Sequence, residues 1–157
     1  MIAPPGRSRS VAVVAMCVSL CLFLWIPVAR AATHSPPSSA GLRSQVLDLV
    51  NRSRSSHGLS ALRLSLPLSA EALAHSRRMA RSGDISHTAN LVDLIHRMGG
   101  TVFGEDVARG RGLRGIYGAW LQRTDTRNVL LDPRFRIVGV GVVHIGGFYW
   151  VTLQAFD

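Results

Sequence analysis

The sequence contains no lysine, and its two cysteines, Cys17 and Cys21, both lie in an apolar run near the N-terminus. After Cys21, neither a disulfide framework nor a cysteine nucleophile is available. No serine stands in the pattern of a nucleophile elbow either. These absences exclude the cysteine- and serine-based hydrolases with recognisable motifs, and they leave burial of apolar side chains as the source of stability.

Residues 1–31 have the three-part order of a secretory signal peptide. Arg7 and Arg9 give a positive start, residues 11–28 are apolar, and an Ala-x-Ala cleavage site ends at Ala31. The apolar run is also long enough to span a bilayer, since roughly 17–25 residues suffice, so an uncleaved anchor is the alternative. We expect cleavage after Ala31, a secreted product and no membrane span in the mature chain.

The chain is basic, and arginine is its only strongly basic side chain. Fifteen arginines stand against nine Asp and Glu residues after Ala31. A basic surface favours anionic partners such as cell-wall polymers or lipid head groups, although scattered arginines in a lysine-free chain also follow from biased codon usage. No basic stretch is interleaved with aromatic residues, so we expect no nucleic-acid partner. We also expect a monomer.

Apolar residues recur at helical spacing in four segments that follow a short linker, rich in proline and serine, at 32–41. Ser69 and Asn90 are the expected N-caps, with Asp93 in the capping-box position behind Asn90. The spacing predicts helices at 42–56, from about Ser69 to Gly83, from Asn90 to Gly99, and at 113–123.

The C-terminal part changes to strand periodicity. Residues 135–144 and 148–156 predict two strands joined by a hairpin turn at Gly146-Gly147, and a shorter strand is expected at 101–107. Both alternating faces of 135–144 are apolar or glycine, which is typical of a strand covered on both sides. The fold class that follows is α+β, a three-layer α/β/α sandwich with a small, mainly antiparallel sheet, in one domain.

Four segments in a fixed order carry a resemblance to a known family. They are 79–87 (Met-Ala-Arg-Ser-Gly-Asp-Ile-Ser-His), 104–110 (Gly-Glu-Asp-Val-Ala-Arg-Gly), 120–135 (Trp to Pro-Arg-Phe), and the strand residues within 138–152. Together they resemble the bacterial branch of the CAP superfamily, which includes cysteine-rich secretory proteins, antigen 5 and plant pathogenesis-related proteins. The resemblance covers residues 42–157 and implies an α/β/α sandwich and an extracellular location.

In the family that the chain resembles, two histidines and two glutamates line a cleft and hold a divalent metal in some members. The first histidine matches His87. The first glutamate matches Glu105, in a Gly-Glu-Asn motif that here ends in Asp106. The position of the second histidine falls on Thr126, and the arginine that follows it in the family matches Arg127.

The second family glutamate falls near Arg123, so two of the four expected metal ligands are replaced. Zinc requires three or four nitrogen, sulfur or oxygen ligands, and the two matched residues supply only two. Asp106, His75 and His144 are conceivable third ligands, but nothing in their spacing requires one. We therefore expect no metal and no other cofactor.

Three functions stay open. We expect a secreted, non-catalytic binding module, whose small apolar or lipid-like ligand, or envelope component, is implied by the resemblance. The candidate ligand-binding residues are His87, Glu105, Asp106, Thr126 and Arg127. The alternatives are a metal-assisted hydrolase that uses His87 and Glu105, and a cationic envelope-associated protein. A His–Glu pair can bind a ligand or move a proton, but it can also simply join two segments of the fold.

Overall fold

The computed structural model describes Met1 and residues 38–157. The expected signal peptide at 1–31, both cysteines and most of the expected linker lie outside the described residues. Within the part of the chain that is described, no helix is both long and apolar enough to cross a membrane.

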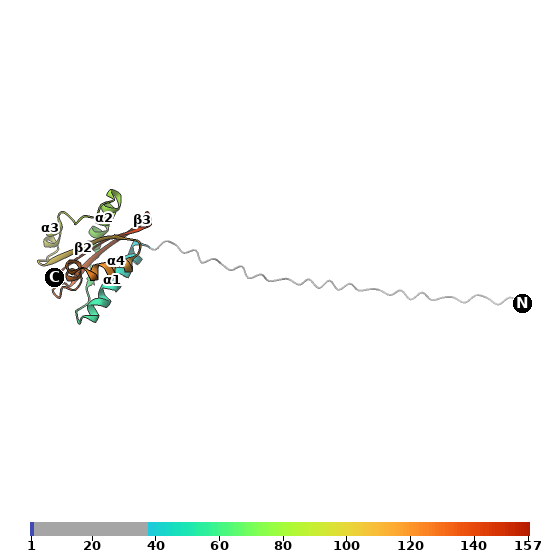
Figure 1. Ribbon diagram of the computed structural model, residues 1–157, viewed down its shortest axis with the longest axis horizontal. Helices are drawn as coiled ribbons and strands as arrows, with labels where there is room; N and C mark the ends of the chain where they lie inside the picture. Colours follow the sequence, from blue (N-terminus) through green and yellow to red (C-terminus); the bar gives the residue numbers. More distant parts are fainter. Residues whose placement is uncertain (2–37) are drawn as a thin grey trace. The chain divides into compact units, whose positions relative to one another are not determined.

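The described residues form five helices and a four-stranded sheet (Figure 1). In the sheet the strands follow the order β1-β3-β4-β2, so β2 is an edge strand. β2 and β3 pair antiparallel with β4, and the two-residue β1 pairs parallel with β3. The elements are α1 (Ser39–Ser56), β1 (Arg63–Leu64), α2 (Leu66–Ser82), α3 (Leu91–Arg97), β2 (Phe103–Gly110), α4 (Leu113–Gln122), α5 (Thr124–Leu130), β3 (Ile137–Ile145) and β4 (Phe148–Phe156).

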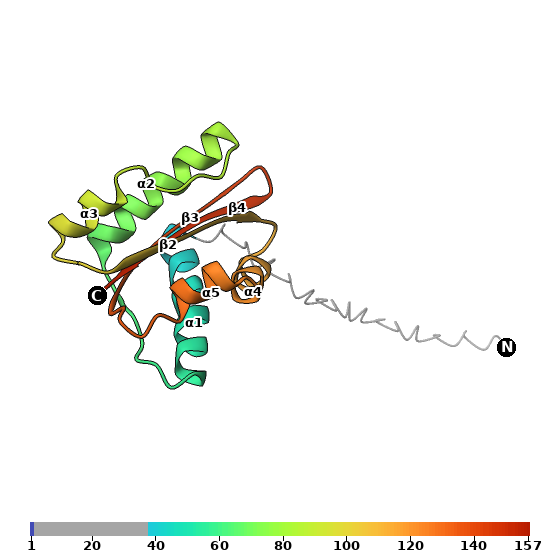
Figure 2. The same cartoon turned by 60° about the vertical axis from the view of Figure 1, so that its left-hand side comes forward.

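The helices cover both faces of this sheet. Figure 2 shows α2 and α3 on one side and α1, α4 and α5 on the other. The expected α+β, three-layer sandwich with a mainly antiparallel sheet is therefore confirmed, with one short parallel strand at an edge. The hairpin turn at Gly146-Gly147 is also confirmed, since both residues have a positive φ.

Strand alternation divides the core between the two helical layers. The main cluster joins the sheet to α1, α4 and α5, and includes Val138, Val140 and Val142 of β3. The opposite face of the sheet packs two smaller clusters under α2 and α3, around Leu68 and around Met79. Because successive side chains of a strand point to opposite faces, a strand that is apolar on both faces has to lie between two layers.

α2 lies unusually close to the middle of β3, because glycine occupies the two positions that face it. A Cβ atom at Gly139 would come within 2.4 Å of the Leu68 side chain, and one at Gly141 within 2.2 Å of the Ala72 and Leu73 backbone. Side chains of α2 then reach the strand backbone itself. The Val140 N–H donates to Ser69 Oγ at 3.2 Å.

The C-terminal end of α1 is held by Arg54, a charged residue with no solvent exposure. Its guanidinium donates to the carbonyl oxygens of Ser60, Leu130, Asp132 and Phe135 at 2.9–3.3 Å. Burial, followed by repulsion from a neighbouring arginine, lowers the pKa of this group. These contacts fix the turn that leads from α5 into β3.

The start of α2 differs from the sequence prediction. The helix begins at Leu66 and its N-cap is Ser65, whose hydroxyl accepts from the Leu68 N–H, so the prediction of Ser69 as the cap is wrong. Pro67 is compatible with the first helical turn because the N–H that it lacks has no intrahelical partner there. Ser69 instead lies buried inside the helix, facing β3.

Two other local predictions are corrected, and two elements were not predicted. α1 begins at Ser39, inside the expected linker, because Ser38 accepts from the Gly41 N–H and caps it. Asn90 is at the N-cap of α3, but its side chain makes no capping hydrogen bond, so the capping box with Asp93 is not formed. The sequence did not predict β1 or α5. β1 has only two residues and α5 is mostly polar, so the sequence shows neither a strand period at β1 nor a helical apolar period at α5.

The substitution Gly141→Ala tests the close approach of α2. The new methyl group would meet helix backbone rather than the flexible end of a side chain, so α2 would have to move off the sheet. We expect the free energy of unfolding to fall by about 3 kcal/mol, measured by urea denaturation. In the control Gly118→Ala on α4, the Cβ meets open space, and we expect a gain of up to ~1 kcal/mol from helix propensity. Equal stability of Gly141→Ala and the parent would contradict this packing.

Candidate functional site

His87 and Glu105, the two residues matched to the family's cleft, are directly bonded. His87 lies in the segment between α2 and α3, and its Nδ1 is 2.8 Å from Oε1 of Glu105 on β2. The exposed fractions differ sharply, because 69% of the His87 side chain is exposed and only 2% of the Glu105 side chain. The pair therefore has a solvent-facing imidazole and a buried carboxylate.

Four donors hold the Glu105 carboxylate. Oε1 accepts from His87 Nδ1 and from the Thr88 N–H, and Oε2 accepts from Thr88 Oγ1 at 2.5 Å and from Gln154 Nε2 at 2.9 Å. Burial alone would raise the pKa of Glu105, but the hydrogen bonds from Thr88, Gln154 and His87 outweigh it and lower the pKa. The carboxylate is ionised, so Nδ1 of His87 is the donor and Nε2 stays free to face outward.

Sequence reasoning did not identify Thr88 and Gln154, which complete this network. Gln154 is fully buried on β4 and is paired in register with Glu105. The signal that was available is a polar amide at an inward position of a strand that is otherwise apolar. Such a residue requires a buried hydrogen-bonding partner.

Asp106, the next residue after Glu105, is in a different chemical state. Strand alternation turns it to the opposite face of the sheet, where it is 2% exposed and its Oδ2 has no hydrogen-bond partner among the described residues. Burial, then repulsion from Asp125 and from Glu105, raises its pKa to about 8. At neutral pH this carboxyl is mostly protonated and uncharged, which makes it chemically similar to the asparagine that the family places here.

A cavity of about 600 Å³ opens between the edge strand β2 and helix α4. Small and apolar groups form part of its lining, including Gly115, Ile116 and Trp120. The lining also includes three cations, Arg109, Arg111 and Arg123. The remaining lining residues are Ile85, His87, Asp106, Val107, Ala108, Gly110, Gly112, Ala119, Asp125 and Thr126. We call this cavity the β2–α4 cleft.

The β2–α4 cleft brings together three of the five candidate site residues, His87, Asp106 and Thr126. Glu105 is not among its lining residues, and it supports the cleft from behind through His87. Arg127 is exposed and borders a different hollow, beside the turn after α5. Four of the five candidates chosen from the sequence therefore lie in or directly behind one cleft.

Two further features of the cleft come from the tertiary structure. Trp120 belongs to the main core cluster and is 3% exposed, but it also lines the cleft and its indole N–H has no partner among the described residues. The Thr126 hydroxyl, in the position of the second family histidine, donates to the Trp120 carbonyl oxygen at 2.6 Å. Thr126 therefore secures the end of α4 while it borders the cleft.

The donor set does not fit the divalent metal that the family resemblance implies. Both oxygens of Glu105 are already occupied by protein donors. Of the conceivable third ligands, His75 bonds the Ser86 carbonyl oxygen and His144 stacks on Tyr149. Within residues 38–157, no three His, Cys, Asp or Glu side chains are grouped as metal ligands.

Comparisons with known proteins identify the family to which the chain belongs. The sequence profile of the cysteine-rich secretory protein (CAP) family matches residues 47–154, which is more than half of the chain. The chain therefore belongs to the CAP family, as its motifs indicated. The YkwD protein of Bacillus subtilis is 27% identical over 124 residues, which cover 74% of this chain and 48% of that protein.

Solved structures show the same fold. A Bacillus anthracis extracellular protein with an SCP domain superposes with a TM-score of 0.64 and 27% identity, over 76% of this chain and 41% of that one. An outer surface protein of Borrelia burgdorferi superposes with a TM-score of 0.66 and 15% identity, over 73% of this chain and 90% of that one. The chain spans about half the length, or less, of YkwD and of the B. anthracis protein. Both structural neighbours are described as extracellular or outer-surface proteins.

The pKa of Asp106 makes the stability of the protein depend on pH. The folded state keeps a proton that the unfolded state has lost between about pH 4 and pH 8, so the free energy of unfolding falls as pH rises through that window. One such proton corresponds to a slope of about 1.4 kcal/mol per pH unit. In Asp106→Asn this contribution is absent, and we expect the variant to be the more stable protein at pH 7–8.

Urea denaturation of the parent and of Asp106→Asn across this pH range checks the prediction. The difference between them should shrink toward pH 4, where the unfolded carboxyl begins to take up the proton that the folded carboxyl already holds. A difference that does not change with pH would mean that Asp106 keeps an ordinary pKa.

Proposed function

We propose that this chain is a secreted, non-catalytic binding module whose β2–α4 cleft holds a small lipid-like ligand with an acidic head group. The observation that carries the proposal is the distribution of groups in the cleft. The glycine, alanine, isoleucine and tryptophan residues of the lining suit an apolar body, and its three arginines suit an anionic head. The volume of about 600 Å³ is in the range of small-molecule sites.

Two polar groups at the cleft add to this argument. The protonated carboxyl of Asp106 and the indole N–H of Trp120 are buried donors without partners in the described part of the chain. Buried donors are normally satisfied, so unpartnered ones beside a cavity favour a ligand that supplies oxygen acceptors. A carboxylate or phosphate head group has such acceptors, and the free Nε2 of His87 provides a further polar contact.

The geometry argues against the hydrolase alternative. A general base or metal ligand needs a free lone pair, and those of Glu105 are taken by four protein donors. The positions of the second family histidine and glutamate hold Thr126 and Arg123, neither of which is a metal ligand of the usual kind. Binding therefore accounts for the cleft better than catalysis does.

The substitution Gly115→Leu tests the cleft as the ligand site. Gly115 lines the cleft and a Cβ atom there meets nothing within 4 Å, so a leucine would fill the cavity without disturbing the fold. We expect at least a tenfold loss of affinity for a fluorescent fatty-acid analogue, measured by titration of the full-length protein. We expect this loss because even one misplaced methylene in a pocket changes the binding free energy by about 1–3 kcal/mol, and a leucine side chain adds more than one.

Gly118→Leu is the matched control. Gly118 is also on α4 and also has open space at its Cβ, but it does not line the cleft. Its affinity should equal that of the parent. Equal binding by both variants would place the ligand elsewhere, and no binding by the parent would refute the ligand class.

A zinc titration by calorimetry tests whether the cleft works without metal. We expect no stoichiometric uptake by the full-length protein, because both Glu105 oxygens are taken by protein donors, the Asp106 carboxyl is mostly protonated at neutral pH, and His87 by itself supplies too few ligands for zinc. The His87→Ala variant should give the same heats as the parent. One-to-one uptake that His87→Ala abolishes would restore the metal-assisted hydrolase.

A further inference from the structure

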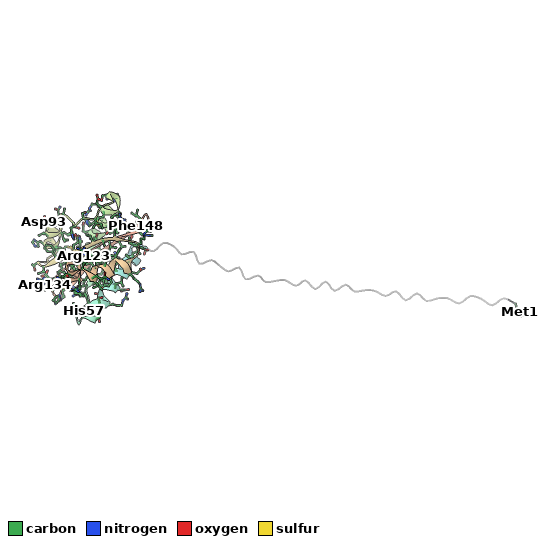
Figure 3. All side chains as sticks on the ribbon, in the orientation of Figure 1. Met1, His57, Asp93, Arg123, Arg134 and Phe148 are labelled. Atoms are coloured by element: carbon green, nitrogen blue, oxygen red, sulfur yellow. The ribbon has the colours of Figure 1, made fainter. Side chains whose placement is uncertain are left out.

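The turn end of the β3–β4 hairpin carries an aromatic and cationic surface that extends beyond the cleft. Its residues are Arg109, Arg111, His144, Ile145, Phe148 and Tyr149, and we call them the hairpin-tip surface. In Figure 3, Phe148 lies on the opposite side of the domain from Arg134. The surface is built at the end of the sheet where Ile145 is paired with Phe148 across the Gly146-Gly147 turn.

Aromatic rings and guanidinium groups are stacked on this surface. Arg109 and Arg111 lie over the Phe148 ring, at 4.7 and 4.9 Å from its centroid. On the other face of the hairpin, His144 stacks on Tyr149 with their ring centroids 4.3 Å apart. Ile145 projects at the turn with an exposed fraction of 50%. The tip thus combines exposed apolar area with cations that are held in place by aromatic contacts.

The segments that form this end of the molecule contain almost no acid to balance their arginines. From residue 107 to 124 there are four arginines and no Asp or Glu, and residues 133–156 contain no Asp or Glu. Arg77 of α2 borders the same end, in a hollow lined by Val142, Val143, His144 and Ile145. The acidic residue that follows α2, Asp84, is exposed.

The chain enters the folded domain at this same end. Ser39, the first residue of α1, lines the hollow that Val142 to Ile145 border. The sequence that precedes Ser39 contains the apolar run 11–28, which is long enough to cross a bilayer. If this run is retained as an anchor, the end of the domain next to the entry point is the end tethered nearest to the bilayer.

We propose that the hairpin-tip surface docks the domain onto an anionic phospholipid bilayer. Ile145 and the rings of Phe148 and Tyr149 insert at the level of the head groups, and Arg109 and Arg111 bind phosphates, which a planar guanidinium can contact through two hydrogen bonds. The exposed side chain of Ile145, beside the glycine turn, can insert among lipid head groups, but it would add nothing to the binding of a soluble polyanion. The proposed docking surface shares Arg109 and Arg111 with the β2–α4 cleft, whereas Ile145, Phe148 and Tyr149 lie outside the cleft lining.

Hydrogen exchange of the full-length protein tests the docking, because it reports on each segment separately from any binding by residues 11–28. The protein is mixed with phosphatidylglycerol-rich vesicles, and in parallel with pure phosphatidylcholine vesicles. At about 0.1 M salt, we expect slower exchange at residues 144–149 with the anionic vesicles only, and less protection at high salt because exposed charges are screened.

The double variant Arg109→Gln/Arg111→Gln should need roughly twenty-five-fold more anionic vesicles for half-protection of residues 144–149, at roughly fivefold for each arginine near the surface. The matched control is Arg63→Gln/Arg97→Gln, which removes the same charge from exposed positions. Arg63 is paired with Ile137, which lies about 26 Å along β3 from Ile145 at 3.3 Å per residue. The control should bind like the parent.

The variant Ile145→Ser separates a bilayer from a soluble anion. It should weaken vesicle binding several-fold while leaving all arginines in place. Three results would overturn the proposal: unchanged exchange at residues 144–149 with anionic vesicles, equal protection by phosphatidylcholine vesicles, or equal protection by soluble polyphosphate.

Discussion

The structure depends on the close contact between α2 and the backbone of β3. Gly139 and Gly141 leave no side chain between helix and strand, so hydroxyls of α2 bond the strand directly. This contact fixes the direction of α2 and therefore the point, at Gly83, where the chain leaves the helix in a left-handed conformation. The segment that follows carries His87 back to β2, so the position of the candidate site is a consequence of this packing.

Strand alternation then gives two neighbouring carboxyls opposite properties. Glu105 faces the α2 layer, where four donors keep it ionised, and Asp106 faces the α4 layer, where burial keeps it protonated. The same edge strand thus provides a fixed charge that positions His87 and a neutral donor at the cleft. Because β2 has no strand on its outer side, the cleft can form against α4 rather than being closed by a further strand.

Basic charge is distributed unevenly over this architecture. At the C-terminal end of α1, the buried guanidinium of Arg54 donates its hydrogen bonds to carbonyl oxygens of the turn between α5 and β3. At the hairpin end, arginines stay exposed and stack on aromatic rings. The cleft and the hairpin-tip surface share Arg109 and Arg111, so a ligand head group and a lipid surface would meet the same cations.

The sequence by itself determined the three-layer sandwich, the hairpin and the family, because apolar periodicity and ordered motifs are local properties of the chain. It also brought His87 and Glu105 together, through the family resemblance. It could not reveal β1, whose two residues form a strand only through pairing with β3, or the true N-cap of α2, Ser65. The tertiary structure alone decided that Glu105 is saturated, that Asp106 is uncharged and that Trp120 borders a cavity, because burial and hydrogen-bond partners come from residues distant in the sequence.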